Sequence, residues 1–505
     1  MKKDNRAHKA KLNIVTSLGG QVITLICGLV VPRLMLSAFG SEAYGLTSSI
    51  TQFLAYITLL EGGIGGVARA VLYKPLSQND METIGDIMAE IRRFFRFIAM
   101  IFAGYVLVLA STFQMISDVE IFDWLSTFLL VIVISISTFG QYFIGISNAI
   151  LLQAAQKTYI TNVISIGATV INAFSTIVFV ELGCSLTLVK LASSCIFFMR
   201  PVVMWLYVSK HYQIPKTGKT QQKQTYLTQK WSGLSQHIAF FLHSNTDVVI
   251  LTILSSLRAV AVYSVYNMII SHVQSLALSF TSGMEAVFGD MMAKEEYEKL
   301  HKTFSTYETI ISVVSVVLFS TTIVMILPFI TLYTAGILDT NYHEPIFAVV
   351  MVLASLCYCL RMPYHALVIA AGHFKQSCPA AYGEAILNIL LSVLLVSKHG
   401  MTGVAAGTLV ATCFRFAYYV YYLSKHIFYR KIQYFVKRFL INVLAIVCSC
   451  VVGLWFGTCL NLNSYLRWMI CGIFVTVFSG LITVGMNVVF YHDNLRSSFR
   501  MVLKK

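Results

Sequence analysis

The sequence predicts an all-α polytopic membrane protein with about fourteen transmembrane helices, built as two pseudo-symmetric six-helix bundles followed by two C-terminal helices. The 505-residue chain is 57% hydrophobic and 12% charged, whereas a soluble protein carries about 25% charged residues. Apolar runs of about 20 residues, long enough to cross a bilayer as a helix, recur along the chain. A twelve-residue pattern also occurs twice, 215 residues apart, which is typical of duplicated transporter halves.

The apolar runs define the expected transmembrane helices in chain order. Polar or glycine-containing segments separate neighbouring runs, and each run is long enough to span the hydrocarbon core. The expected spans are residues 14–38, 43–68, 96–116, 123–148, 160–181, 186–208, 233–255, 259–286, 308–333, 346–370, 379–397, 401–423, 439–460 and 464–491.

The repeat sets the expected domain organisation. Its copies are Arg200–His211 and Arg415–His426, and each places an arginine in an apolar run that ends in Ser-Lys-His. Shifting the first four spans by 215 residues brings them near the seventh to tenth spans. We therefore expect an N-terminal bundle at 1–215, a second bundle at 216–430, and two extra helices with a basic tail at 431–505. Because six is even, both bundles enter the membrane from the same side.

The distribution of Lys and Arg predicts the orientation. With the N-terminus inside, 28 of the 37 basic residues lie in cytoplasmic segments and three lie outside. This bias predicts cytoplasmic termini, and it explains the net charge of +15 without nucleic-acid binding. The expected outer loop 117–122 is acidic, with Asp118 and Glu120. The polar segment Lys210–Lys230 is the expected linker between the bundles. The segment Asp80–Arg93 has the apolar spacing of an amphipathic helix on the inner membrane surface.

Several charged residues fall inside or at the edge of the expected spans, where a charge is costly and usually faces a partner or a watery cavity. Near span ends, snorkelling is an alternative for the basic residues Arg33, Arg69 and Lys190. The deeper arginines, expected to face a cavity or to form structural ion pairs, are Arg200, Arg361 and Arg415. The acids, which either couple H⁺ or Na⁺ movement or pair with the arginines, are Glu61, Asp247, Glu285 and Glu384.

No feature of the sequence indicates an enzyme. The eleven cysteines lie in or beside apolar runs, where cysteine behaves as a small packing residue. We find no metal-ligand cluster, nucleophile triad or phosphate-binding loop in the sequence. We therefore expect no catalytic residues, no metal and no cofactor.

The order of several short motifs resembles that of the polysaccharide-unit flippases (Wzx-type) of the multidrug/oligosaccharidyl-lipid/polysaccharide exporter superfamily, over nearly the whole chain. Where such proteins often show Asp-x-Gly and Gly-Asn, this chain has Glu61-Gly-Gly and Gly289-Asp290. Besides the two arginine stretches, the motifs that carry the resemblance are Asn245–Thr252, Val262–Tyr266, Ala371–Lys375, Glu384–Asn388 and Gly400–Thr408.

The resemblance implies that two bundles rock about a central cavity and move an undecaprenyl-diphosphate-linked oligosaccharide from the inner to the outer leaflet. It places the chain, as a monomer, in the bacterial cytoplasmic membrane, and it assigns it to the biosynthesis of a surface polysaccharide such as O-antigen or capsule. The implied partners are the lipid-linked oligosaccharide, membrane lipids and, as a further candidate, a polysaccharide polymerase.

The arginines fit such a substrate, because a guanidinium binds phosphate through several hydrogen bonds in one plane. The candidate diphosphate-binding residues are Arg33, Arg69, Arg200, Arg361 and Arg415. Two alternatives remain open at this point. One is a cation-coupled multidrug antiporter of the same fold, and the other is a non-transporting membrane scaffold of cell-envelope assembly.

Overall fold

The computed structural model describes residues 3–61, 64–117, 122–212, 234–281, 283–428 and 430–503, and these ranges contain helices and connecting turns but no strand. Asp118, Glu120 and the expected linker from residue 213 onward lie outside the described residues. The chain divides into two compact units, Met1–Phe241 with Ser256–Ala261 and Leu242–Ser255 with Val262–Lys505. We call these unit 1 and unit 2.

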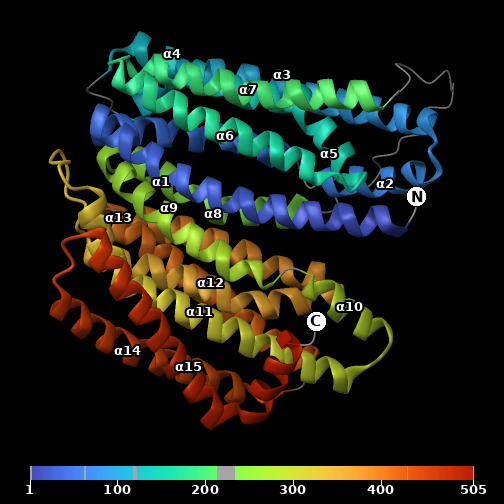
Figure 1. Cartoon of the computed structure of the whole chain (residues 1–505), viewed down its shortest axis with the longest axis vertical. Coiled ribbons are helices and arrows are strands. Elements are labelled where there is room, and N and C mark those ends of the chain that lie inside the picture. Colours follow the sequence, from blue (N-terminus) through green and yellow to red (C-terminus); the bar gives the residue numbers. More distant parts are fainter. Residues whose placement is uncertain are drawn as a thin grey trace. The chain divides into compact units, whose positions relative to one another are not determined.

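Unit 1 is a bundle of long helices that lie side by side (Figure 1). Helix α6 packs against both α1 and α7, and α4 packs against α3 and α7. A short π-helix, η2, interrupts the fourth predicted span between α4 and α5. The elements are α1 (Lys3–Ala55), η1 (Tyr56–Glu61), α2 (Ile64–Gln78), α3 (Met81–Ser117), α4 (Trp124–Gly140), η2 (Gln141–Gly145), α5 (Ile146–Ala154), α6 (Thr158–Glu181) and α7 (Leu186–His211).

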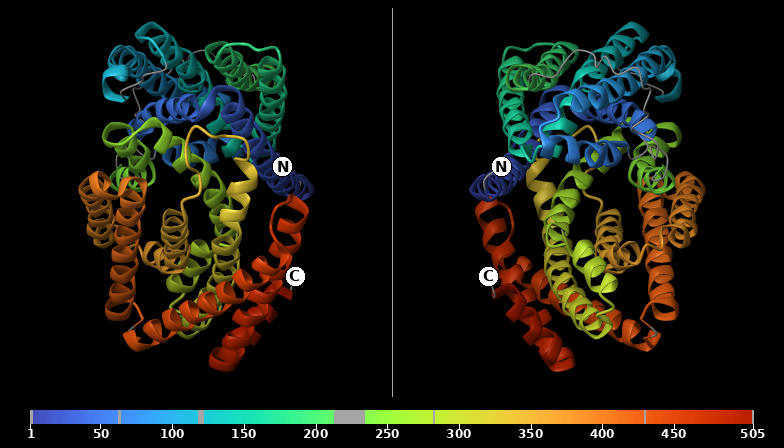
Figure 2. Two further views of the ribbon diagram at one scale, coloured as in Figure 1. Left: turned by 90° about the vertical axis from the view of Figure 1, so that its left-hand side faces the viewer. Right: turned by 90° about the vertical axis from the view of Figure 1, so that its right-hand side faces the viewer.

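Unit 2 contains most of the remaining helices. Helix α13 packs along α12, and the C-terminal pair of helices α14 and α15, drawn in red in Figure 2, contacts α11. The first parts of α8 and α9, up to Phe241 and Ala261, belong to unit 1. The remaining elements of the chain are α8 (Leu234–Leu254), α9 (Leu257–Ser279), α10 (Met284–Ala293), α11 (Tyr297–Tyr333), α12 (Pro345–Ala370), α13 (Phe374–His426), α14 (Ile432–Leu460) and α15 (Tyr465–Leu503).

The helices confirm an all-α polytopic membrane protein. In the described part of the chain, ten helices are long and apolar enough to cross a membrane. Two of these, α1 and α13, are each a pair of helices that meet at a glycine with positive φ, Gly40 at 81° and Gly400 at 52°. Glycine adopts this backbone conformation without steric cost. These bends separate the first span from the second and the eleventh from the twelfth, as the hydropathy pattern predicts.

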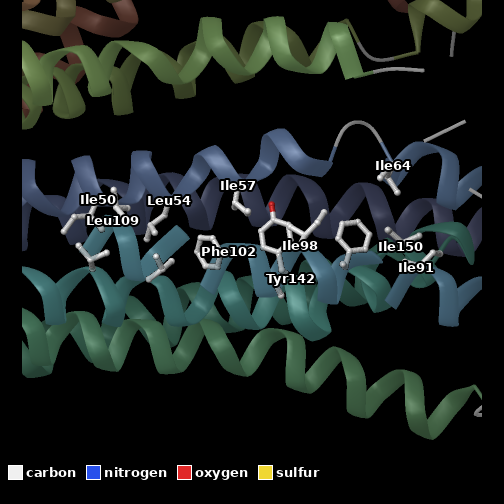
Figure 3. Packing of buried hydrophobic residues seen from close by; sticks show 14 of the residues in the cluster. Ile50, Leu54, Ile57, Ile64, Ile91, Ile98, Phe102, Leu109, Tyr142 and Ile150 are labelled. Atoms are coloured by element: carbon white, nitrogen blue, oxygen red, sulfur yellow. The ribbon is translucent and has the colours of Figure 1, made fainter. Parts of the chain in front are cut away.

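The prediction of a surface helix at Asp80–Arg93 is wrong. The segment after Asp80 is the first part of α3, which continues without a break to Ser117. Its apolar face is buried in the core of unit 1, where Ile84, Ile87 and Ile91 are fully enclosed. Figure 3 shows part of this core, which α2 and α5 help to cover. Protein, rather than lipid, therefore covers the hydrophobic face.

The predicted span 259–286 is too long at its end. Helix α9 stops at Ser279, and Gly283, with φ 86°, precedes the short helix α10. Glu285 lies in the first turn of α10, where its side chain is exposed. It is therefore not buried within the eighth span as the apolar run suggested.

The repeated stretch adopts the same local geometry in both units. The ring of Tyr207 stacks on His211 at 4.0 Å and 17°, and the ring of Tyr422 stacks on His426 at 4.6 Å and 18°. Both pairs occur at the C-terminal end of a long helix and are 215 residues apart. This likeness supports the duplication, while superposition of the two six-helix halves remains a prediction.

The bend in α13 brings its two arms into close contact. A side chain at Gly403 would place its Cβ 2.5 Å from the backbone oxygen of Leu395. We expect Gly403→Ala to lower the stability by about 1–3 kcal/mol, because the backbone would have to move apart. Gly104→Ala in α3 is the matched control, since a Cβ there meets nothing within 4 Å, and alanine favours a helix over glycine. Equal melting temperatures for the two variants in detergent would contradict this packing.

Candidate functional site

Two of the predicted arginines converge on one predicted acid in unit 2. Arg361 on α12 donates from Nη1 to Oε1 of Glu384 at 2.7 Å, and Arg415 on α13 donates from Nη1 to Oε2 at 2.5 Å. Glu384 lies in the first arm of α13 and Arg415 in the second. The three side chains are almost fully buried, at 3%, 4% and 0% exposure for Arg361, Arg415 and Glu384. Both arginines therefore form buried ion pairs with Glu384, as expected if their role is structural.

Aromatic side chains complete the surroundings of this cluster. Arg361 lies over the ring of Tyr358 at 4.7 Å, and Arg415 donates from Nη2 to the Tyr419 hydroxyl at 3.1 Å. The same hydroxyl lies 3.2 Å from Nδ1 of His365. The ring contact and the hydroxyl bonds lower the cost of burying two cations, although Nε of Arg361 keeps no hydrogen-bond partner.

A second buried acid in unit 2 was not among the sequence candidates. Glu308 on α11 accepts hydrogen bonds from Arg438 on α14 and from the Tyr364 hydroxyl on α12, and Arg430 lies 3.6 Å away. Arg438 also donates to the hydroxyl of Thr309. The cluster fastens α14 to α11 and α12. Glu308 opens one predicted span and Arg438 immediately precedes another, so charges at span boundaries were the signal that could have found them.

Asp247 on α8 is buried without a basic partner. Its Oδ2 accepts hydrogen bonds from the hydroxyls of Tyr263 and Thr408, both at 2.9 Å, while Oδ1 has no hydrogen-bond partner. Asn388 donates to Thr408 at 3.2 Å and accepts from Ser392 at 3.2 Å. In the described part of unit 2 no Lys or Arg pairs with Asp247. The site therefore offers one carboxylate and several neutral oxygens, which are the ligands that hard cations prefer.

Arg200 on α7 differs from its repeat counterpart Arg415. Its guanidinium lies over the ring of Phe197 at 4.7 Å, its Nε has no hydrogen-bond partner, and it forms no ion pair within the described residues. The reason is visible in the repeat. Asn172 aligns with Asn388, so Ala168 stands in unit 1 where Glu384 stands in unit 2. The repeated arginine therefore has a carboxylate partner in one unit only, among the described residues.

The other sequence candidates of unit 1 occupy separate places. Arg69 on α2 donates to the side-chain oxygen of Gln153 on α5 at 2.7 Å. Arg33 on α1 and Lys190 on α7 are half-buried. Glu61 ends η1 beside Tyr142, whose hydroxyl hydrogen-bonds it. Thus, among the sequence candidates, the structure brings Arg361, Arg415 and Glu384 together in one cluster.

Comparison with known proteins identifies the fold. No family model matches the chain, and no curated protein matches its sequence. Solved structures do match, among them the lipid II flippase MurJ in an inward closed conformation, with a TM-score of 0.69, 13% identity, and coverage of 95% of this chain and 100% of that one.

Two multidrug transporters are similar as well. An inward-facing MATE transporter of the MOP superfamily matches with a TM-score of 0.57, 14% identity, and coverage of 80% of this chain and 94% of its own. The MATE transporter DinF-BH in complex with R6G matches at 0.56, with 15% identity and coverage of 83% and 97%. The chain therefore has the fold shared by MurJ and the MATE transporters.

The ion cluster around Glu384 predicts a large stability effect. We expect Glu384→Ala to reduce the stability by about 3–5 kcal/mol, because it leaves two buried guanidiniums without a counter-charge. Thermal unfolding of the purified protein in detergent measures the change. The control is Glu285→Ala, which removes an exposed carboxylate of the same unit and should melt like the unaltered protein. If both variants melt alike, the cluster does not hold α12 and α13 together.

Proposed function

We propose that the chain is a flippase that moves an undecaprenyl-diphosphate-linked oligosaccharide from the inner to the outer leaflet of the bacterial cytoplasmic membrane, for surface-polysaccharide biosynthesis. The fold it shares with MurJ and the order of its Wzx-like motifs support this proposal. The observation that carries it is Arg200, an arginine in a membrane-length helix without an acidic partner among the described residues. An unpaired cation within a membrane-spanning helix is energetically costly, and the binding of an anion would offset that cost.

The distribution of charge between the units favours an anionic ligand at unit 1. Of the six basic residues that the sequence places within spans, Arg33, Arg69, Lys190 and Arg200 belong to unit 1, whereas Arg361 and Arg415 belong to unit 2 and share Glu384. Unit 2 also holds Asp247 and Glu308. We infer that unit 1 supplies the first contacts to the diphosphate, with Arg200 as the main phosphate ligand.

The chemistry of the substrate fits these residues. A guanidinium can donate two parallel hydrogen bonds to one phosphate, and a diphosphate presents two such groups. The prenyl tail stays in lipid throughout, so the protein has to hide only the charged and sugar-bearing part. Alternating access then exposes the arginines first to one side of the membrane and then to the other.

Asp247 is the best candidate for coupling to an ion gradient. A buried carboxylate with a free oxygen, neutral oxygen neighbours and no basic partner can take up H⁺ or Na⁺. It belongs to a hydrogen-bonded group that joins α8, α9 and the two arms of α13. Cation binding there would change how these helices pack, which links ion occupancy to the conformation of unit 2.

A cation-coupled multidrug antiporter is the second candidate function. The MATE neighbours and the unpaired Asp247 favour it, because an organic cation needs a carboxylate. Growth in the presence of cationic drugs, measured beside surface polymer, separates the two functions. A non-transporting scaffold would reduce polymer without accumulation of lipid-linked units on the inner leaflet. In each case we propose that both termini are cytoplasmic and that the protein acts as a monomer.

Substitution of Arg200 tests the proposed substrate. In a cell that lacks its flippase, we expect Arg200→Ala to abolish most surface polymer, and Arg200→Lys to retain part of it, because Lys keeps the charge and loses the two-pronged geometry. The free energy of unfolding of both variants should stay within about 0.5 kcal/mol of that of the unaltered protein, as expected for a side chain without an ion pair. Arg415→Ala is the contrasting variant, since it breaks the Glu384 cluster and should melt early. Normal polymer with Arg200→Ala would refute the assignment.

Substitution of Asp247 tests the coupling. We expect Asp247→Asn to keep the hydrogen bonds to Tyr263 and Thr408 and to lose the negative charge that attracts a cation. In proteoliposomes, transport by the unaltered protein should rise with an imposed Na⁺ or H⁺ gradient, whereas the Asn variant should respond at least about tenfold less. Glu285→Gln, which removes an exposed carboxylate of the same unit, is the control for the loss of one negative charge. An undiminished gradient response in Asp247→Asn would contradict the role.

A further inference from the structure

Unit 2 contains a cavity lined by three histidines that the functions above do not use. The cavity has a volume of about 770 Å³ and lies among the ends of α10, α11, α12 and α13. Its polar lining is His301, His373, His426 and Tyr297, and the remaining lining residues are Gly, Ala, Met and Ile. None of the lining residues is acidic. The loops that carry these residues are those that the Lys and Arg distribution places on the cytoplasmic side.

Each imidazole keeps a ring nitrogen available for a ligand. His373 uses Nδ1 for the Tyr422 hydroxyl at 2.8 Å, and His426 uses Nδ1 for the backbone oxygen of Tyr422 at 3.3 Å. His301 packs on the ring of Phe428 at 4.3 Å and makes no hydrogen bond within the described residues. The rings are therefore held in place by aromatic contacts while their Nε2 atoms stay free. Among the described residues, no group of three or more His, Cys, Asp or Glu side chains is arranged to hold a metal ion, and this includes the three rings.

The charges around the cavity favour an anion. A lysine lies within two residues of each cavity histidine in the chain. Lys302 follows His301, Lys375 follows His373, and Lys425 precedes His426. Four acidic residues also lie near the cavity in the chain: Asp290 and Glu296, which pair with Lys294 and Lys299 at 2.8 Å, and Glu295 and Glu298. The nearby basic residues outnumber them, since Arg430 acts on His301 as well and the six are Lys294, Lys299, Lys302, Lys375, Lys425 and Arg430.

We propose that this three-histidine cavity binds a phosphate ester at the cytoplasmic membrane surface, and that its occupant is the diphosphate-sugar headgroup of the substrate before it enters the transport path. The assignment of that occupant rests on the proposed flippase function. Imidazoles donate hydrogen bonds to phosphate oxygens, and the volume exceeds the need of a diphosphate alone. Tyr297, 57% exposed at the rim, offers a ring on which a sugar can stack.

The repeat provides a matched control. His211 forms the same stack on Tyr207 that His426 forms on Tyr422, but it lies in unit 1 outside the cavity. No histidine of unit 1 takes the places of His301 and His373 in the repeat. A loss of binding that follows the cavity histidines and spares His211 therefore separates the site from a general effect of removing histidine.

The test measures binding of radiolabelled farnesyl diphosphate to the purified full-length protein, with inorganic pyrophosphate and farnesol as competitors. We expect the triple variant His301→Gln, His373→Gln and His426→Gln to bind at least about tenfold more weakly, and His211→Gln to bind normally. Competition by pyrophosphate equal to that of the lipid identifies free phosphate as a sufficient ligand, and weaker competition identifies the lipid headgroup. Either result supports the site.

Three outcomes overturn the proposal. They are unchanged affinity in the triple variant, absence of binding to the unaltered protein, and displacement by farnesol as strong as by farnesyl diphosphate. Melting temperatures check that the triple variant folds, and the exposed single changes His301→Gln and His426→Gln replace it if it does not. If Arg200→Ala stops polymer export while the triple variant binds normally, the cavity is wrong and the flippase function stands. If the cavity binds but no variant alters polymer, the function is wrong and the phosphate site stands.

Discussion

The buried carboxylate of Glu384 determines how the central helices of unit 2 pack. An isolated charge in a membrane-spanning helix is costly, and the cost falls only when counter-charges and hydrogen bonds surround it. Glu384 obtains both from Arg361 and Arg415, which requires α12 to lie along both arms of α13. Glu308 imposes the same requirement on α11, α12 and α14 through Arg438 and Tyr364. Two carboxylates thus hold five helical segments of unit 2 in register.

This constraint gives the two copies of the repeated arginine different tasks. Arg415 is paired with Glu384, whereas Arg200 forms no ion pair among the described residues and Ala168 stands at the position that aligns with Glu384. Under the proposed function, the carboxylate that is present in unit 2 only distinguishes a structural arginine, Arg415, from a phosphate ligand, Arg200.

The sequence predicts the helices well because bilayer thickness fixes their length, and the bends at Gly40 and Gly400 follow from glycine between apolar runs. It does not predict the partners of the charges, since Glu384 lies 23 residues from Arg361 and 31 from Arg415, and pairing depends on which helix faces meet. Glu308 and Arg438 were missed because each falls at a span boundary, where a charge resembles a loop residue. The first part of α3 was misassigned because an amphipathic face suits lipid and protein equally.

The most direct measurement places a carboxylate at the position of unit 1 that aligns with Glu384 in the repeat. The variant Ala168→Glu recreates in unit 1 the acid that neutralises Arg415 in unit 2, and Ala168→Gln adds a side chain of equal size without charge. If the free charge of Arg200 binds the diphosphate, surface polymer in a flippase-deleted cell should be lost with Glu and largely retained with Gln, at equal amounts of folded protein. Full polymer export by the Glu variant would contradict the central role of an unpaired Arg200.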